Sequence, residues 1–274
     1  MNLVLHHGLF GFASLGEIVY FNGVKEHLAA RFPGLLRILV TQVPPAGTIE
    51  VRGTSLGRQI QQALQPGGAL DPDETVHIIA HSMGGLDSRF LLSPDNPDNM
   101  ADRISSLTTI ATPHRGSPVA DVLVAIENAV GIGDEESLLI NTLRAALEQA
   151  NIEVGGVRSL TTESLRRFNE QFRDNDATVK FSVAGVGRGI RIIIPLDTCG
   201  ALRVPHRIIE SKTGEDNDGL VSPSSAAWGT GPELWRADHA DEIGHNLDLG
   251  FRARPRHFDY LSKYEALVDR LRQL

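Results

Sequence analysis

The chain has a single cysteine, no excess of basic residues and no apolar run long enough to cross a membrane. Because Cys199 has no second cysteine to pair with, no internal disulfide can form, and stability must come from packing, to which a metal ion could add. The 26 Lys and Arg residues are outnumbered by 34 Asp and Glu, and the formal net charge is -8. This balance argues against a nucleic-acid partner, because a phosphate backbone demands a basic face.

The first ten residues, MNLVLHHGLF, lack the positive start and long apolar stretch of a signal peptide, so we interpret them as a first core strand. The 274 residues, 41% of them hydrophobic, are enough for one α/β domain. Expected strands cover 3–5, 35–40, 75–80, 106–113, 179–186 and 234–239, and expected helices lie around 24–32, 56–64, 84–92 and 260–271. This alternation predicts a doubly wound, mostly parallel sheet.

The most informative stretch is VHIIAHSMGG, residues 76–85, in which an apolar strand pattern ends abruptly at a serine among small residues. It predicts a nucleophile elbow, a sharp turn from strand to helix that holds the nucleophile at its tip. Ser82 would be the nucleophile and Gly84 one small neighbour, while Ala80 stands where glycine is usual. Alanine is still small enough for the turn to close.

A serine hydroxyl needs a histidine base and a carboxylate that orients the base, in the chain order serine, acid, histidine. Asp218 lies in a turn-forming NDG tripeptide, and His239 follows the last predicted strand. We therefore predict that Ser82, Asp218 and His239 form a catalytic triad. Alternative acids are Glu215 and Asp216, and the chain has nine other histidines, among them His81, His114, His245 and His257. The side chain of His81 should point away from the hydroxyl of its neighbour and support the elbow.

An oxyanion hole requires two backbone N–H groups aimed at the developing negative charge. One should come from Met83, directly after the nucleophile, and the other from the glycine-containing loop HGLFG, residues 7–11. We assign the second donor to Leu9.

Two helical patterns fill residues 119–150, and they carry more apolar positions than one buried face requires. They are either ordinary core helices or a movable lid whose apolar inner face covers a lipid-binding cleft.

Together with several longer phrases, these residues resemble the true lipases of bacterial lipase family I, most closely the Proteus-type subfamily that folds without a dedicated chaperone. The matching phrases are HGLFGF, YFNGV (20–24), EVRG (50–53), AHSMGG, TPHRGSPVAD (112–121), SLTTESLRRFNEQF (159–172), NDGLVSPSS and DHADEIGHNL. The resemblance implies an α/β-hydrolase fold in a single domain, 1–274, with a helical lid over 118–155. It also favours His239 over the other histidines as the catalytic base.

The resemblance further implies a structural calcium ion near the histidine loop, with carboxylates from Asp197 and Asp241 and backbone carbonyls from His245 and Leu249. Family members commonly have glutamine at the position of His245, but a carbonyl ligand does not depend on the side chain. The residues alone do not predict this site. The family also implies a monomer without an organic cofactor, acting on lipid or ester substrates at an oil–water interface and typically exported from the cell.

The expected activity is hydrolysis of long-chain fatty-acid esters through an acyl-enzyme. A carboxylesterase or thioesterase acting on short, soluble acyl groups would share the same triad and differ in pocket and lid. A catalytically silent binding module is the third interpretation, and it would be marked by a broken triad.

Overall fold

The computed structural model describes residues 1–9, 19–128, 154–187, 202–245 and 258–274. Most of the expected lid, together with Asp197, Cys199, Leu249 and His257, lies outside these residues. Among the described residues, no helix is both long and apolar enough to span a membrane.

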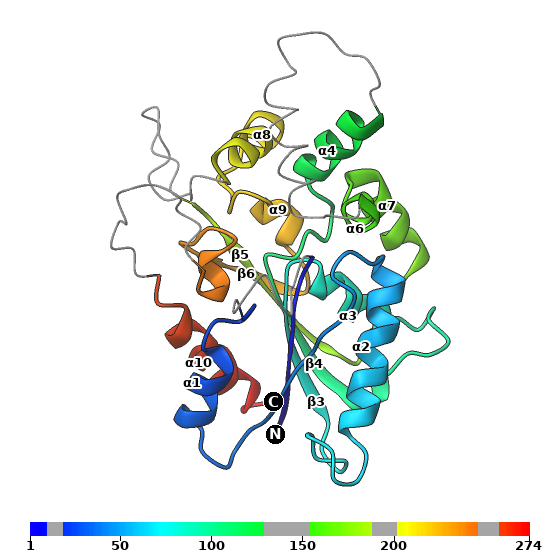
Figure 1. Cartoon of the computed structure of the whole chain (residues 1–274), viewed down its shortest axis with the longest axis vertical. Coiled ribbons are helices and arrows are strands. Elements are labelled where there is room, and N and C mark those ends of the chain that lie inside the picture. The colour runs from blue at the N-terminus through cyan, green and yellow to red at the C-terminus, as the bar shows by residue number, and fades with distance from the viewer. Residues whose placement is uncertain (10–18, 129–153, 188–201, 246–257) are drawn as a thin grey trace.

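In the described residues, six parallel strands form a central sheet in the order β2-β1-β3-β4-β5-β6 (Figure 1). The strands are β1 (Asn2–His6), β2 (Arg37–Val40), β3 (Val76–His81), β4 (Ile104–Ile110), β5 (Val179–Gly185) and β6 (Thr230–Trp235). β1 and β3 are buried along their whole length, as expected of central parallel strands whose two faces are both covered.

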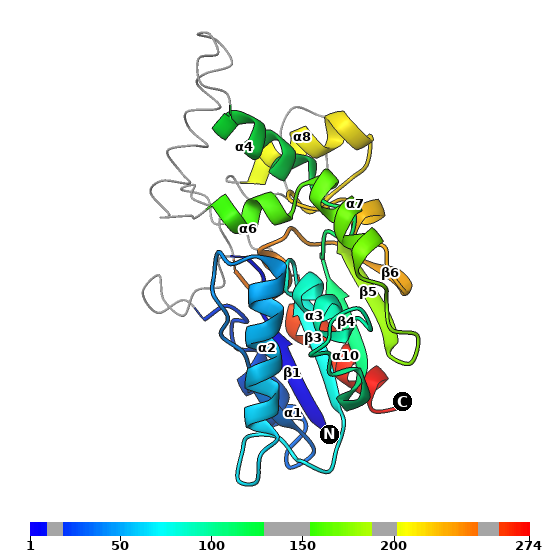
Figure 2. The ribbon, with the colours of Figure 1, turned by 90° about the vertical axis from the view of Figure 1, so that its right-hand side faces the viewer.

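Helices cover both faces of the sheet and its upper end (Figures 1 and 2). The α-helices are α1 (Val24–Arg31), α2 (Ile49–Ala63), α3 (Gly84–Leu92), α4 (Pro118–Asn128), α6 (Val154–Ser159), α7 (Thr162–Gln171), α8 (Arg203–Thr213), α9 (Pro223–Ala226) and α10 (Tyr260–Leu271). Two short 3₁₀ turns, η1 (Ala101–Arg103) and η3 (Asp241–Ile243), complete the described elements.

The alternation of side chains along β1 divides the core into two layers. Leu3 and Leu5 face the cluster that contains α1 and α10, while Val4 faces the cluster that contains α2 and α3. Each buried leucine contributes about 1.5–3 kcal/mol relative to an exposed one, so both layers stabilise the sheet between its helices.

The carboxyl ends of the strands point towards α4, α6, α7, α8 and α9, which lie together beyond the sheet (Figures 1 and 2). In parallel sheets the loops at this end carry the functional groups. The turn after β3, which contains Ser82, is at this end.

The last strand differs from its expected position over 234–239. β6 begins at Thr230 and ends at Trp235, and it contains Gly231 and Pro232, two residues that normally indicate a turn. Because β6 is at the edge of the sheet, a proline that cannot donate a ladder hydrogen bond is tolerated there. The chain after Trp235 leaves the sheet before it reaches His239.

Candidate active site

Ser82 lies at a sharp turn between β3 and α3, with the left-handed backbone angle φ = 55° that is unfavourable for a residue with a side chain. Its neighbours fix this conformation. The Ser82 N–H donates to the Ile110 carbonyl at 2.8 Å, and the Thr112 hydroxyl donates to the Ser82 carbonyl at 2.7 Å. A Cβ atom at Gly84 would lie 2.7 Å from the His7 carbonyl oxygen, so the helix can begin here only with glycine.

Asp218 and His239, which are far apart in the sequence, are in direct contact. The His239 Nδ1–H donates to Asp218 Oδ2 at 2.7 Å, and the His239 backbone N–H donates to the Asp218 carbonyl at 2.9 Å. The other carboxylate oxygen accepts the backbone N–H groups of Leu220 and Val221 at 2.7 and 2.6 Å. Asp218 is fully buried, so its carboxylate is fixed on both oxygens and sets the orientation of the imidazole.

Ser82 and His239 line the same cavity, which has a volume of about 320 Å³. Its lining is mainly aliphatic, and the side chains come from α4, α6 and the loops beyond the sheet: Val119, Leu123, Val157, Leu160, Leu202 and Leu220. Among the hydrogen bonds of the described residues, none joins the Ser82 hydroxyl to His239. Ser82 and His239 therefore share one apolar cavity but are not hydrogen-bonded to each other.

His81 lies against His239, with ring centroids 4.5 Å apart. Its Nδ1 contacts the Tyr20 hydroxyl at 2.7 Å and its Nε2 contacts Glu242 Oε2 at 3.0 Å. Burial lowers the pKa of His81 well below its usual value, so this ring is neutral. Burial, together with the nearby carboxylate of Asp218, raises the pKa of Glu242 well above its usual value. The ring of His81 is thus held between Tyr20, Glu242 and His239.

The loop after β1 approaches Ser82 closely. A Cβ atom at Gly8 would lie 2.6 Å from the Ser82 Cβ, so only glycine fits there. The side chain of Leu9 lines the cavity, and Met83 is the N-cap residue of α3. Both expected oxyanion donors are thus next to Ser82, one in sequence and one in space.

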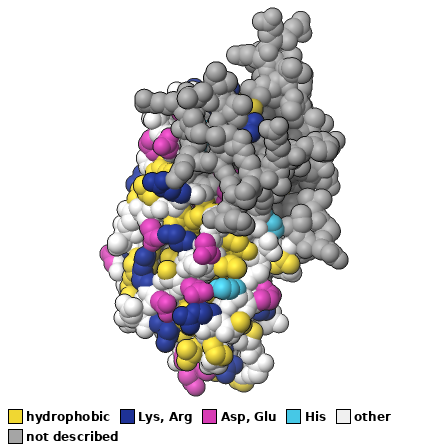
Figure 3. Space-filling model, turned by 90° about the vertical axis from the view of Figure 1, so that its left-hand side faces the viewer, with side chains coloured by type: hydrophobic (Ala, Val, Ile, Leu, Met, Phe, Trp, Pro, Cys, Tyr) yellow, Lys and Arg dark blue, Asp and Glu magenta, His cyan; other side chains and the backbone are white. Residues whose placement is uncertain are grey.

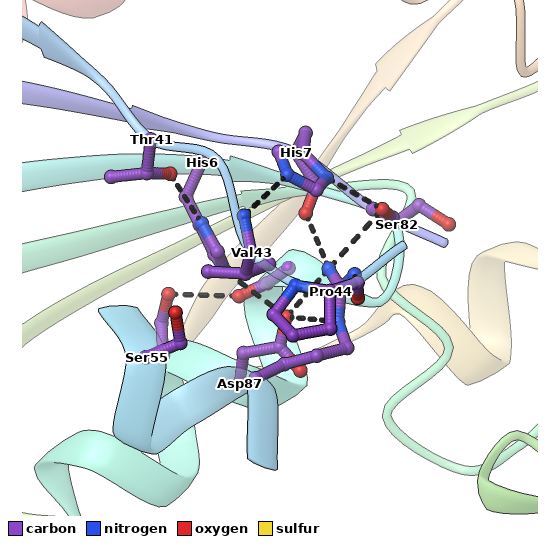
Figure 4. A network of polar contacts seen from close by, with 12 residues as sticks. His6, His7, Thr41, Val43, Pro44, Ser55, Ser82 and Asp87 are labelled. Atoms are coloured by element: carbon purple, nitrogen blue, oxygen red, sulfur yellow. Dashed lines mark hydrogen bonds and ion pairs between the residues drawn. The ribbon is translucent and has the colours of Figure 1, made fainter. Parts of the chain in front are cut away.

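A buried polar network lies directly beneath this loop (Figure 4). Its centre is an ion pair between Arg52 on α2 and Asp87 on α3, both with fully buried side chains, with Nε 2.8 Å from Oδ2. His6 and Thr41 extend it, with His6 Nε2 3.0 Å from Asp87 Oδ2 and His6 Nδ1 2.7 Å from the Thr41 hydroxyl. Sequence reasoning did not find this network, although the phrase EVRG contains its arginine.

The alternative candidates occupy other places. His114 stacks on Trp228 and contacts Arg89, while His245 donates through Nε2 to the Val19 and Tyr20 carbonyls at 2.8 and 3.0 Å. Asp216 is exposed, and Glu215 accepts the backbone N–H of Ser224. None of these groups has the contact that joins Asp218 to His239.

Of the four expected calcium ligands, only Asp241 and His245 lie within the described residues. Asp241 begins η3, two residues after His239, and the His245 backbone N–H donates to the Ala240 carbonyl at 2.9 Å. A separate group of side chains of types that can bind a metal, His81, His239 and Glu242, has its ligand atoms within 4.8 Å of one another. This group is rich in imidazole nitrogen and so does not match calcium, which prefers oxygen ligands.

Several known proteins are similar to this chain in sequence or in structure. The family described as PGAP1-like alpha/beta domain matches residues 56–131. Triacylglycerol lipase 2 of Saccharomyces cerevisiae is 34% identical over 235 residues, covering 85% of this chain and 64% of the yeast protein, so the chain spans just under two thirds of that relative. A triacylglycerol lipase of Vibrio cholerae is 29% identical, covering 90% of this chain and 80% of the relative.

Among solved structures, the Staphylococcus hyicus lipase superposes with a TM-score of 0.69 at 20% identity, over 99% of this chain and 95% of that one. The mature Bacillus licheniformis lipase BlEst2 superposes with a TM-score of 0.65 at 21% identity, over 91% of this chain and 88% of that one. The chain has the α/β-hydrolase fold. At these identities the superpositions establish the fold alone, and the chemistry must be argued from the site.

Proposed function

We propose that the protein is a serine lipase that hydrolyses carboxylic esters of long-chain fatty acids, such as triacylglycerols. The observation that carries this proposal is the buried Asp218–His239 hydrogen bond at an apolar cavity that also contains Ser82 at the tip of a strained turn. The similarity to relatives named triacylglycerol lipase supports the same class of reaction.

In this mechanism the Ser82 hydroxyl attacks the ester carbonyl while His239 Nε2 takes the hydroxyl proton. Asp218 accepts the Nδ1–H bond, which leaves Nε2 as the basic nitrogen and stabilises the imidazolium that forms. The backbone N–H groups of Leu9 and Met83 stabilise the negative oxygen of the tetrahedral intermediate. His239 then protonates the leaving alcohol, and a water molecule that it activates releases the fatty acid from the acyl-enzyme.

The aliphatic lining of the cavity supports a fatty acyl chain as the substrate group. Val119, Ala120 and Leu123 of α4 reach the cavity from the start of the segment 118–155, and Val157 of α6 reaches it from just after the end of that segment. A polar or charged acyl group would lose hydration there without finding partners, whereas an alkyl chain gains from leaving water. We therefore retain the proposal that 118–155 is a lid region within one domain.

We also propose the structural calcium ion of the Proteus-type subfamily, held by Asp197, Asp241, His245 and Leu249. The donor chemistry fits, because Asp241 supplies a carboxylate and lies in the turn that follows His239. Burial, followed by the negative charges of Asp218, Asp238 and Asp241, raises the pKa of Glu242, and the same three charges favour a divalent cation nearby. When bound, the ion would brace the loop that carries His239 and take no part in proton transfer.

The chain-length preference tests the proposed substrate class. We expect the wild type to hydrolyse p-nitrophenyl esters from butyrate to palmitate and an emulsified triglyceride, because the apolar cavity accepts long alkyl groups. Ser82→Ala should remove this turnover and leave the circular dichroism spectrum unchanged. Activity confined to short, soluble esters would indicate a carboxylesterase or thioesterase, and substantial residual activity in Ser82→Ala would refute the assigned nucleophile.

The choice of acid is tested by separate Asp218→Asn and Asp216→Asn variants. In Asp218→Asn the amide can still accept the Leu220 and Val221 N–H bonds, but its NH₂ group forces the wrong tautomer on His239. Turnover should fall by about 10⁴-fold, as for the corresponding change in other triads. Asp216 is exposed, and its variant should keep wild-type turnover. The opposite pattern would reassign the acid to Asp216.

Removal of calcium tests the metal proposal. Because a ligand that binds only the folded state stabilises it by about 2.7 kcal/mol at a hundredfold excess over its Kd, EDTA should lower the melting temperature by several degrees. Added Ca²⁺ should restore it. Asp241→Asn should abolish the EDTA effect, while Asp216→Asn keeps it. A melting temperature of the wild type that does not respond to EDTA would contradict the calcium site.

A further inference from the structure

The side chain of Arg52 binds the backbone of the loop next to Ser82. Its Nη2 donates to the His7 carbonyl at 2.7 Å and to the Gly8 carbonyl at 3.1 Å, and its Nη1 donates to the Pro44 carbonyl at 2.9 Å. Asp87 accepts its Nε–H. All three nitrogens of the guanidinium therefore have acceptors, which are the Asp87 carboxylate and three backbone carbonyl oxygens.

The side chain of His7 also binds the Gly8 carbonyl. The Val43 N–H donates to His7 Nε2 at 3.0 Å, so Nε2 carries no proton and Nδ1 does. Nδ1 then donates to the Gly8 carbonyl at 2.8 Å. Burial, with the neighbouring charge of Arg52 and the ring of His6, lowers the pKa of His7 to about 3, so the ring keeps this tautomer at ordinary pH.

The orientation of the Gly8 carbonyl determines where the next N–H points. The peptide bond between Gly8 and Leu9 is trans, since the cis peptide found in the described residues is Gly231–Pro232. In a trans peptide the carbonyl and the following N–H point in opposite directions. Because the carbonyl of Gly8 faces Arg52 and His7, the Leu9 N–H faces away from them. Leu9 also lines the cavity that contains Ser82.

We propose that Arg52 and His7 are positioning residues that hold the Gly8–Leu9 peptide with its N–H already aimed at the oxyanion before substrate binds. The proposal rests on the serine-hydrolase function proposed above. Neither side chain touches substrate. Two donors on one carbonyl prevent the peptide from rotating, and Gly8 is pressed against the Ser82 Cβ, so the donor and the nucleophile keep a fixed relation.

Asp87 connects Arg52 to the helix that follows the nucleophile. It lies in the first turn of α3, the helix that begins directly after the elbow, and its Oδ2 accepts from both Arg52 and His6. The two backbone donors of the oxyanion hole thus come from segments joined by one buried ion pair. If the N–H donors of the oxyanion hole are already in position, they need no rearrangement when the transition state forms. Electrostatic stabilisation of the transition state is most effective under this condition.

The test compares Arg52→Lys with Arg58→Lys on the same helix, whose side chain is exposed. Lysine keeps the positive charge next to Asp87, but it lacks the second set of N–H groups with which Arg52 binds the His7, Gly8 and Pro44 carbonyls. We expect kcat on p-nitrophenyl butyrate to fall by about 10- to 100-fold in Arg52→Lys, somewhat less than the loss of one oxyanion donor, with KM within about twofold. Arg58→Lys should match the wild type.

A second measurement separates positioning from simple destabilisation. An alkyl boronic acid forms a tetrahedral adduct with the serine oxygen, and one of its oxygens occupies the oxyanion hole. Its inhibition constant should rise in Arg52→Lys by the same factor as kcat falls. His7→Leu should behave alike, and His7→Gln, which retains a donor and an acceptor, should recover part of the loss. The His7 variants leave the Arg52–Asp87 pair intact and give the answer if Arg52→Lys fails to fold.

The proposal is overturned if Arg52→Lys and His7→Leu lower the melting temperature but leave kcat and the inhibition constant unchanged. It is equally overturned if only KM rises. A wild type that neither hydrolyses esters nor binds the boronic acid would instead remove the proposed function, and the positioning role with it.

Discussion

The ion pair between Arg52 and Asp87 is the interaction on which the rest of the site depends. It joins α2, the helix after the nucleophile and the loop after β1 at a point that water does not reach. Removing one partner of such a pair typically costs about 3–5 kcal/mol, because the other charge stays buried without compensation. Arg52 also satisfies three backbone carbonyls, so the same side chain supports the fold and shapes the reaction centre.

A rigid sheet with apolar layers on both faces carries this centre at its carboxyl edge. Ser82 lies on the turn after β3, and His239 follows β6. The positive φ of Ser82 is maintained only because its N–H and carbonyl are both hydrogen-bonded to the next strand and the residues after it. Helices beyond the strands add the aliphatic cavity, so the proposed polar chemistry and the proposed acyl site meet at one serine.

Sequence reasoning predicted the parallel sheet, α3 and α10 well, because their apolar patterns are continuous or strictly periodic. It placed the last strand too late, because Gly231 and Pro232 indicate a turn. It also predicted the pairing of Asp218 with His239, through the chain order that the fold requires. The contact of His81 with Glu242, 161 positions away, and that of Arg52 with His7, 45 positions away, have no local pattern from which they could be derived. The roles of the triad and oxyanion residues stay predictions.

Covalent labelling tests the central claim most directly, because it asks which side chain is the nucleophile. The protein is treated with a fluorophosphonate and digested, and the modified peptide is identified by mass spectrometry. The account predicts one adduct, on Ser82, whose formation parallels the loss of ester hydrolysis and slows strongly when His239 is replaced by alanine. An unmodified Ser82, or loss of activity through an adduct on another residue, would contradict it.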